Sequence, residues 1–333
     1  MLDVRRLRLL RELARRGTIA AVAEALAFSP SAVSQQLGVL EREAGLPLLE
    51  RTGRRVRLTP AALNLVRHAE VVLERLEQAD AELAGARTGL AGALRIGAFP
   101  TATRAIVPAA LADLARRHPG LEPMLSETDP AAVAHALRAG ELDVALIHSY
   151  DFVPDPEEAG LTTRPLYREA MYLAAPAGRP DTWTGGTSGP GPVPGTGSGT
   201  GSGTGPGAAP GQDEVLRAHR DAPWITATPG TLCHAMTVRA CQAAGFGPRV
   251  RHRVDEFATV LALVAAGLGV AVVPQLGTPG SDVPGVALTR LRMERRTRIA
   301  FRSGAGAHPA VAAFTASLRS ALPPDLAGRG AGT

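Results

Sequence analysis

The sequence has few cysteines, few aromatic residues and no long apolar run. Its 333 residues include two cysteines, Cys233 and Cys241, which excludes a disulfide framework. The first residues are charged (Asp3, Arg5, Arg6) with no apolar segment behind them, so no signal peptide is expected. No apolar run reaches about 18 residues, the length that a membrane span needs. We therefore expect a cytoplasmic protein without membrane contact.

Patterns typical of catalysis and metal binding are also missing. No two of the eight histidines lie three or four positions apart, which argues against a metal site on a helix. The glycine-rich stretches do not satisfy GxGxxG, since Val272 stands where Gly267 and Gly269 would require a glycine, and no GxSxG is present. We expect neither an enzyme nor a bound cofactor or metal.

The excess positive charge lies in the first 60 residues. Of 36 basic and 31 acidic residues in the chain, this segment holds eleven arginines and six acids, a net charge of +5, and the remainder is neutral. A basic module attached to a neutral body indicates a polyanion partner for that module. A solvated basic face is the alternative.

Three short helices are expected within the first 45 residues, and the third has a distinctive outer face. It begins in the stretch FSPSAVSQQL (28–37), with Ser29 as N-cap and Pro30 at the first helical position. Apolar residues at helical spacing predict a buried stripe: Val33, Leu37 and Leu40. Away from that stripe lie uncharged hydrogen-bonding side chains: Ser31, Ser34 and Gln35. Two helices joined by a short turn, the second with such a face, predict a helix-turn-helix.

Two further segments extend this DNA-binding module. The stretch LPLLERTGRRVRLTP (46–60) alternates apolar and polar residues around a turn, which predicts a hairpin, or wing. Between Pro60 and Gly85 the segment contains no glycine or proline. Its apolar residues recur at spacings of 4, 3, 4, 3 and 4: Leu65, Ala69, Val72, Leu76, Ala79 and Leu83. This heptad pattern predicts a long dimerisation helix. An amphipathic helix packed on its own domain is the alternative.

The rest of the chain alternates strands and helices, as in an α/β fold with a parallel sheet. Strands are expected at LRIGAF, EPMLSET, LDVALIH, APWITAT, VRHRV and GLGVAVVP. Residues 184–211 are a low-complexity Gly/Ser/Thr/Pro insert that cannot bury a core, so we expect a flexible loop there.

Residues 17–52 resemble the winged helix-turn-helix of LysR-type transcriptional regulators. The later segments LRIG, GELDVALI and LVAAGLGVAVVP match that family in the same order. The resemblance implies a winged helix-turn-helix at 1–59, a linker helix at 60–88, and a periplasmic-binding-protein-like effector domain of two α/β subdomains at 92–322. Residues 323–333 are expected to be a flexible tail.

The resemblance also implies partners. It predicts a double-stranded DNA operator, a small-molecule effector, a homodimer or homotetramer, and contact with RNA polymerase. The expected DNA-binding residues are Ser29, Pro30, Ser31, Ser34, Gln35, Arg51, Arg54 and Arg55. Gln suits bidentate bonding to adenine, whereas the wing arginines suit phosphates or the minor groove. Pro30-Ser31 and Gln35 depart from the family's usual Gln-Pro and Arg, so the preferred bases can differ.

The effector is expected at the carboxyl ends of the strands, in a cleft between the two α/β halves. The candidate residues are Phe99, Thr101, Ala102, Thr103, Thr128, His148, Thr226 and Thr228. Hydroxyls beside helix N-termini suit a carboxylate or another oxyanion. The alternative for Thr101, Thr128 and Thr228 is a helix N-cap, and for His148 a satisfied histidine at the rim.

Three rival functions share parts of this pattern. A solute-binding protein of the same fold lacks the basic N-terminal module and would need a signal peptide. An enzyme with a DNA-binding arm lacks a catalytic constellation. A ligand-independent regulator with a degenerate cleft stays open from the sequence.

Overall fold

The computed structural model describes residues 1–52, 55–86, 89–155, 158–178, 211–278 and 283–327. The chain forms two compact units. The first comprises Met1–Ile147, Glu157–Leu166 and Arg298–Ala327, and the second comprises His148–Pro156 and Tyr167–Thr297. None of the helices in the described ranges combines the length and the apolar character that crossing a membrane requires.

The first unit begins with the three predicted helices and the predicted hairpin. Their bounds are α1 (Val4–Arg16), α2 (Ile19–Ala25), α3 (Pro30–Ala44), β1 (Leu49–Thr52) and β2 (Arg55–Leu58). Each helix starts at a side-chain cap: Asp3, Thr18 and Ser29 accept backbone N–H groups of the first turn. Gly17, at φ 73°, ends α1 in the left-handed conformation that glycine adopts without strain. The helix-turn-helix and its wing are confirmed.

One apolar core holds these elements together. Val33, Leu37 and Leu40 of α3 are at most 1% exposed and pack with leucines of α1 and with Val22 of α2. The hairpin pairs antiparallel, with Leu49 opposite Leu58. Glu41 Oε1 accepts the N–H groups of Leu48 (2.9 Å) and Leu49 (3.0 Å), which fixes the wing to the end of α3.

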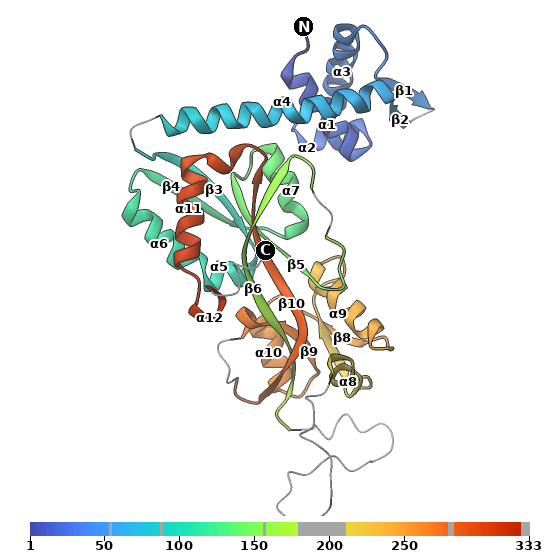
Figure 1. Cartoon of the computed structure of the whole chain (residues 1–333). Coiled ribbons are helices and arrows are strands. Elements are labelled where there is room, and N and C mark those ends of the chain that lie inside the picture. Colours follow the sequence, from blue (N-terminus) through green and yellow to red (C-terminus); the bar gives the residue numbers. More distant parts are fainter. Residues whose placement is uncertain (53–54, 87–88, 156–157, 179–210, 279–282, 328–333) are drawn as a thin grey trace, which may run out of the picture. The chain divides into compact units, whose positions relative to one another are not determined.

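The predicted linker helix is α4 (Pro60–Gly85), a single helix of 26 residues capped by Thr59 (Figure 1). Its first half packs on α1, where Ala62 and Ala69 are fully buried. Further along the same helix, Leu76 (46% exposed) and Leu83 (67%) face solvent, as does Val72. The predicted seam is therefore buried at its start and exposed over the rest of its length.

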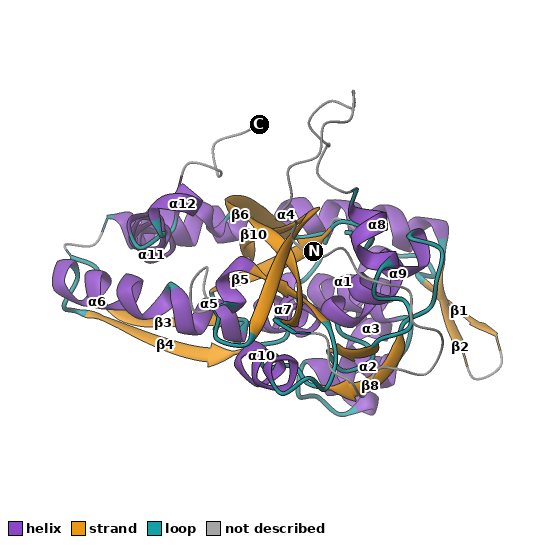
Figure 2. Cartoon of the chain, turned by 90° about the horizontal axis from the view of Figure 1, so that it is seen from below, coloured by secondary structure: helices purple, strands orange, loops and turns teal. Residues whose placement is uncertain are grey.

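The remaining part of the first unit is a parallel sheet covered by helices. Strand β3 (Gly92–Ala98) lies between β4 (Leu121–Glu127) and β5 (Val144–Tyr150) and pairs parallel with both. The helices are α5 (Pro100–Ala105), α6 (Val107–Arg117), α7 (Pro130–Ala139), η3 (Ala305–Ala307), α11 (Pro309–Ser320) and α12 (Pro324–Ala327). Helix α6 runs beside β3 and β4 and packs against α11 (Figure 2). Parallel pairing brings the carboxyl ends of β3 and β4 to one edge.

The second unit contains the other predicted strands. These are β7 (Pro223–Thr226), parallel to β8 (Arg249–Arg253), and β9 (Ala271–Pro274). Its helices are α8 (Gln212–Arg217), α9 (Leu232–Ala243), α10 (Phe257–Ala265) and η2 (Gln275–Gly277). Trp224, fully buried, lies in the core beside α9.

Two long strands were not expected from the sequence. They are β6 (Leu161–Pro176) and β10 (Val286–Arg302), and each runs from one unit into the other. The sheet order is β4-β3-β5-β10-β6-β9. Because β6 pairs antiparallel with β9, the sheet is mixed rather than parallel throughout. Residues 179–210, which hold most of the glycine-rich insert, and residues 328–333 of the predicted tail lie outside the described residues.

Candidate functional site

The outer face of α3 presents the residues expected to meet DNA. Ser29 accepts the N–H of Ala32 at 3.1 Å and its hydroxyl lies 3.0 Å from that of Ser31. Ser31 and Gln35 are exposed and Ser34 is half-buried. The neighbouring Gln36 instead accepts a hydrogen bond from Arg6 Nε at 2.9 Å. Of the two glutamines in the motif, Gln35 is the exposed one, and Gln36 is bonded within the protein.

Two of the three wing arginines that were expected to meet DNA lie on the strands of the hairpin. Arg51 lies on β1 opposite Val56, and Arg55 lies on β2 opposite Thr52. Arg54 falls outside the described residues. Arg57, which sequence reasoning left out, is exposed on β2. An alternation of exposed and inward positions along the strand, read from Val56 and Leu58, would have identified it.

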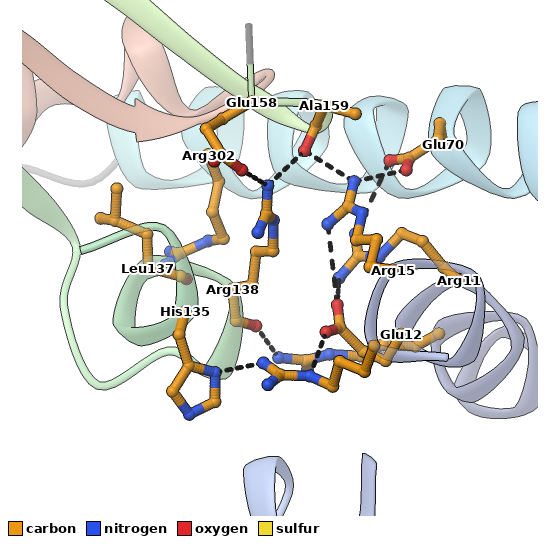
Figure 3. Close-up of polar contacts among 12 residues, drawn as sticks. Arg11, Glu12, Arg15, Glu70, His135, Leu137, Arg138, Glu158, Ala159 and Arg302 are labelled. Carbon is orange, nitrogen blue, oxygen red and sulfur yellow. Dashed lines mark hydrogen bonds and ion pairs between the residues drawn. The ribbon is translucent and has the colours of Figure 1, made fainter. Parts of the chain in front are cut away.

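Helix α1 uses its arginines inside the protein (Figure 3). Five of the eleven arginines in residues 1–60 have internal partners, namely Arg6, Arg8, Arg11, Arg15 and Arg16. Three of them, Arg11, Arg15 and Arg16, pair with Glu12, which is 1% exposed; the Arg11 and Arg16 guanidinium groups each lie 3.1 Å from its carboxylate. Burial raises the pKa of Glu12, but the neighbouring arginines lower it by more than burial raises it. The pKa of Glu12 therefore lies below its ordinary value.

This arginine cluster also reaches the effector region of the same unit. Arg16 donates to Nδ1 of His135, and Arg8 donates to the carbonyl oxygen of Arg138. Arg15 bonds to the carboxylate of Glu70 and to the carbonyl of Ala159 at 2.6 Å. Helix α1 of the DNA-binding domain is thus tied to α7 and to the segment before β6 (Figure 3).

In the first unit, the effector candidates follow β3 and β4. Phe99, Thr101 and Ala102 are buried, at 0–3% exposure. The half-buried Thr103 hydroxyl lies 2.7 Å from both the carbonyl of Pro100 and Oε1 of Glu127, and it donates to these acceptors. Thr128 is half-buried and its hydroxyl donates to the carbonyl of Ser126 at 3.3 Å.

In the second unit, the candidates are Thr226, Thr228 and His148. Thr226 is buried and donates to the carbonyl of Ala227 at 3.1 Å. Thr228 is exposed, and its hydroxyl and N–H bind the carboxylate of Asp255 at 2.7 and 2.8 Å. Carboxylates thus accept the hydroxyls of both Thr103 and Thr228. Negative charge of the protein therefore lies beside each of these two hydroxyls.

The N-cap alternative for three of these threonines is wrong. The N-caps of α5, α7 and α9 are Phe99, Asp129 and Thr231. Helix α5 has six residues, so its N-terminus offers only a short dipole.

A buried polar cluster in the second unit was missed by sequence reasoning. Arg295 (1% exposed) pairs with Glu169 (0%) at 2.7 Å, and Glu169 also accepts the N–H of Leu276. The Tyr150 hydroxyl lies 2.8 Å from the Cys233 sulfur, and burial raises the pKa of Tyr150 well above its ordinary value. Burial, followed by the charge of Arg295, holds the pKa of His148 well below its ordinary value, so its imidazole is neutral. Glu169 and Arg295 lie on β6 and β10, two strands that the sequence did not predict, whereas His148 and Tyr150 lie on β5 and Cys233 lies on α9.

Comparison with known families agrees with this architecture. Residues 4–63 match the model of the bacterial regulatory helix-turn-helix protein, lysR family, and residues 87–323 match the LysR substrate binding domain. The chain belongs to the LysR family of transcriptional regulators. This LysR-family protein therefore binds DNA and carries the family's effector-binding domain.

Several relatives of this LysR-family protein are linked to hydrogen peroxide. It is 31% identical over 290 residues to the "probable hydrogen peroxide-inducible genes activator" of Mycobacterium avium, covering 85% of this chain and 83% of the relative. A full-length OxyR variant from Pseudomonas aeruginosa has a TM-score of 0.54 and 25% identity, with 97% and 99% of the two chains covered. An H2O2-bound OxyR variant from Corynebacterium glutamicum has a TM-score of 0.53 and 26% identity, with 96% and 92% covered.

Proposed function

We propose that this LysR-family regulator reads its operator with the outer face of α3. One observation carries the proposal: Ser31 and Gln35 are exposed on α3 while Val33, Leu37 and Leu40 anchor the opposite face in the core. A helix held in this way can enter a major groove and present hydrogen-bonding side chains to base edges. The wing arginines Arg51, Arg54 and Arg55 would hold the flanking backbone.

We propose that α4 joins two copies of the chain. Val72, Leu76 and Leu83 share one stripe of the helix and are exposed, which leaves a hydrophobic seam available to a second α4. A dimer with two recognition helices would address a two-fold operator.

The experiment is a protection map of the DNA flanking the gene with the purified full-length protein. A protected region made of two related half-sites spaced by whole helical turns supports the proposal. Protection of one half-site, or binding without sequence preference, would contradict it. If Ser31 contacted the bases without Gln35, discrimination between operator sequences would be weaker. A variant of Gln35 is therefore the decisive comparison with the wild type.

For the effector, we propose a molecule that presents hydrogen-bond donors. The Glu127 carboxylate lies beside the Thr103 hydroxyl, and that of Asp255 lies beside Thr228, so a donor on the ligand would find acceptors at either place. A thermal-shift screen should compare matched amine, amide and carboxylate compounds. Stabilisation by carboxylates alone would refute this preference.

Peroxide response is a second candidate function, favoured by Cys233. This thiol lies at the second position of α9, a helix of 12 residues, and close to the Tyr150 hydroxyl, two features that favour a thiolate. The thiolate would attack one oxygen of H2O2, the O–O bond would break, and the leaving hydroxide would take a proton to become water. The product is a sulfenic acid on Cys233.

The second cysteine does not serve as a direct disulfide partner in this structure. Cys241 lies eight residues further along α9, a rise of about 12 Å, whereas a disulfide needs Cα atoms within about 7 Å. Burial raises the pKa of the Cys241 thiol to about 12. Sulfenic-acid labelling after H2O2 treatment should therefore occur in wild type and Cys241→Ser but not in Cys233→Ser. Equal labelling of both single variants, or none in wild type, would exclude this role.

A further inference from the structure

The contact between α1, α4 and α7 contains more arginine donors than acceptors. Arg11 is 7% exposed and bonds to Glu12 through Nη2, and Arg138 bonds to Glu158 and Ala159 through Nη2 (Figure 3). The Nε–H groups of Arg8, Arg11 and Arg138 are nevertheless buried, and no acceptor within the described part of the chain reaches them. Buried guanidinium donors are normally hydrogen-bonded, so these three positions call for an acceptor that is not a residue described here.

The same arginines line a cavity of about 60 Å³. Its wall includes four arginines and three glutamates: Arg8, Arg11, Arg138, Arg302, Glu70, Glu74 and Glu77. Glu70 pairs with Arg15 and Glu77 pairs with Arg302 at 2.7 Å, whereas Glu74 is exposed to solvent. At about 15 Å³ for each water position, the cavity has room for roughly four waters, for chloride with some water, or for one tetrahedral oxyanion.

Positive charge exceeds negative charge at the wall of the cavity, where four arginines face three glutamates. Burial, followed by the charge of Arg11 and with a contribution from Arg302, lowers the pKa of Arg8. Among the residues that the structure describes, no carboxylate lies within ion-pair distance (4.0 Å) of Arg8, whose hydrogen-bond acceptor is the carbonyl of Arg138. An anion in the cavity would therefore offset part of the positive charge of the arginines and accept hydrogen bonds from their Nε–H groups.

We propose that this cavity is a binding site for one small inorganic anion, chloride or an oxyanion of phosphate size. The anion would accept hydrogen bonds from arginines of α1 and α7 at once. A bound anion would strengthen the attachment of helix α1, which belongs to the DNA-binding domain, to the effector region. Water alone in the cavity is the competing outcome.

The test is thermal unfolding of the full-length protein at constant ionic strength. Sodium gluconate, whose anion is too large for the cavity, is replaced stepwise by sodium chloride, and in a second series by sodium phosphate. We expect a saturable rise in the midpoint of about 3 °C in wild type. Arg8→Gln should lose the rise. The matched control is Arg75→Gln, which changes an exposed arginine of α4 that bonds to Gln78, and it should retain the rise.

The outcomes separate specific binding from general salt effects. An equal rise in wild type, Arg8→Gln and Arg75→Gln would mean screening and would overturn the proposal, as would no rise in wild type. If Arg8→Gln does not fold, the broadening of the chloride-35 NMR line by the wild-type protein tests for the anion site instead. Broadening that phosphate suppresses supports the site, and absence of broadening refutes it. The size of the bound ion follows from which series saturates at the lower concentration.

Discussion

Helices α1 and α3 belong to one DNA-binding domain but use their polar side chains in opposite ways. In α1, Arg11 and Glu12 are 7% and 1% exposed and pair with each other and with neighbours. In α3, Ser31 and Gln35 are exposed and uncharged. In α1 these charged side chains are therefore paired inside the protein, whereas in α3 these uncharged side chains are open to solvent.

The comparison shows that the basic N-terminal segment has fewer arginines available for DNA than its sequence suggests. A net charge of +5 in residues 1–60 predicts an electrostatic footprint for DNA. Five of the eleven arginines there have partners inside the protein, so fewer of them remain to meet phosphate than the count implies. The number of arginines in a sequence therefore overestimates how many of them a DNA duplex meets when a buried ion-pair network is present.

The largest effect is expected at the seam of α4, which has a buried half against α1 and an exposed half. Leu76→Asp places a charge on the exposed half, so we expect a monomer whose operator affinity is about a hundredfold or more lower, since binding through two sites is lost. Sedimentation and DNA titration measure this. A variant that stays dimeric would place the dimer interface elsewhere.

The buried charge of α1 can be broken at its centre. Glu12→Ala leaves Arg11, Arg15 and Arg16 without their shared carboxylate, which should cost about 3 kcal/mol of unfolding free energy. Glu24→Ala, at an exposed position of α2, is the control and should change stability by less than about 0.5 kcal/mol. Urea unfolding compares them. Equal, small losses would mean that the network contributes little.

The pH dependence of this difference has a defined sign. The folded-state pKa of Glu12 is depressed, so its contribution is present above the unfolded-state pKa and is lost as the pH falls through the lower folded-state pKa. The stability gap between wild type and Glu12→Ala should therefore narrow in acid.

The reading face of α3 can be tested without disturbing the fold. Gln35→Ala should cost about 1–3 kcal/mol on the specific operator and relax the preference at one base pair per half-site. Helix content should not change, because Gln35 lies off the buried stripe. Competition against single-base operator variants measures the effect. An equal loss on every sequence would transfer the reading role to Ser31, Ser34 or DNA shape.

Salt dependence distinguishes inward arginines from outward ones. Arg54→Ala, if Arg54 contacts phosphate, should weaken binding to all sequences alike and lower the slope of log affinity against log salt by about one. Arg15→Gln should leave that slope unchanged, since Arg15 bonds to Glu70 and Ala159. Equal slopes for both variants would contradict the contrast between α1 and the wing.

The smallest effect is expected from the glycine-rich insert. Deletion of residues 186–208 should change the unfolding free energy by less than about 1 kcal/mol and leave DNA affinity unaltered, because closure of a loop depends weakly on its length. Calorimetry and DNA titration check both. A fall of several degrees in the melting temperature would give the insert a structural role.

The sequence by itself determined the DNA-binding domain and the family. Thr18 and Ser29 each cap a helix by accepting the N–H of the residue three positions ahead, and the stripe of α3 follows from helical spacing. Such signals are local, so they can be found along the chain without knowledge of its fold. The six predicted strands of the body were found in the same way.

Only the tertiary structure decided which polar groups are available. Arg302 bonds to Glu77 across 225 positions, and Glu169 bonds to Arg295 across 126 positions. The Thr103 hydroxyl meets Glu127 because β3 and β4 pair in parallel and end at the same edge. Strand β10 escaped prediction because its sequence, VALTRLRMERRTRIAFR, buries arginine and threonine among its inward positions. Hydrogen bonds and charges of this kind depend on distance in space, which residue types and spacings do not encode.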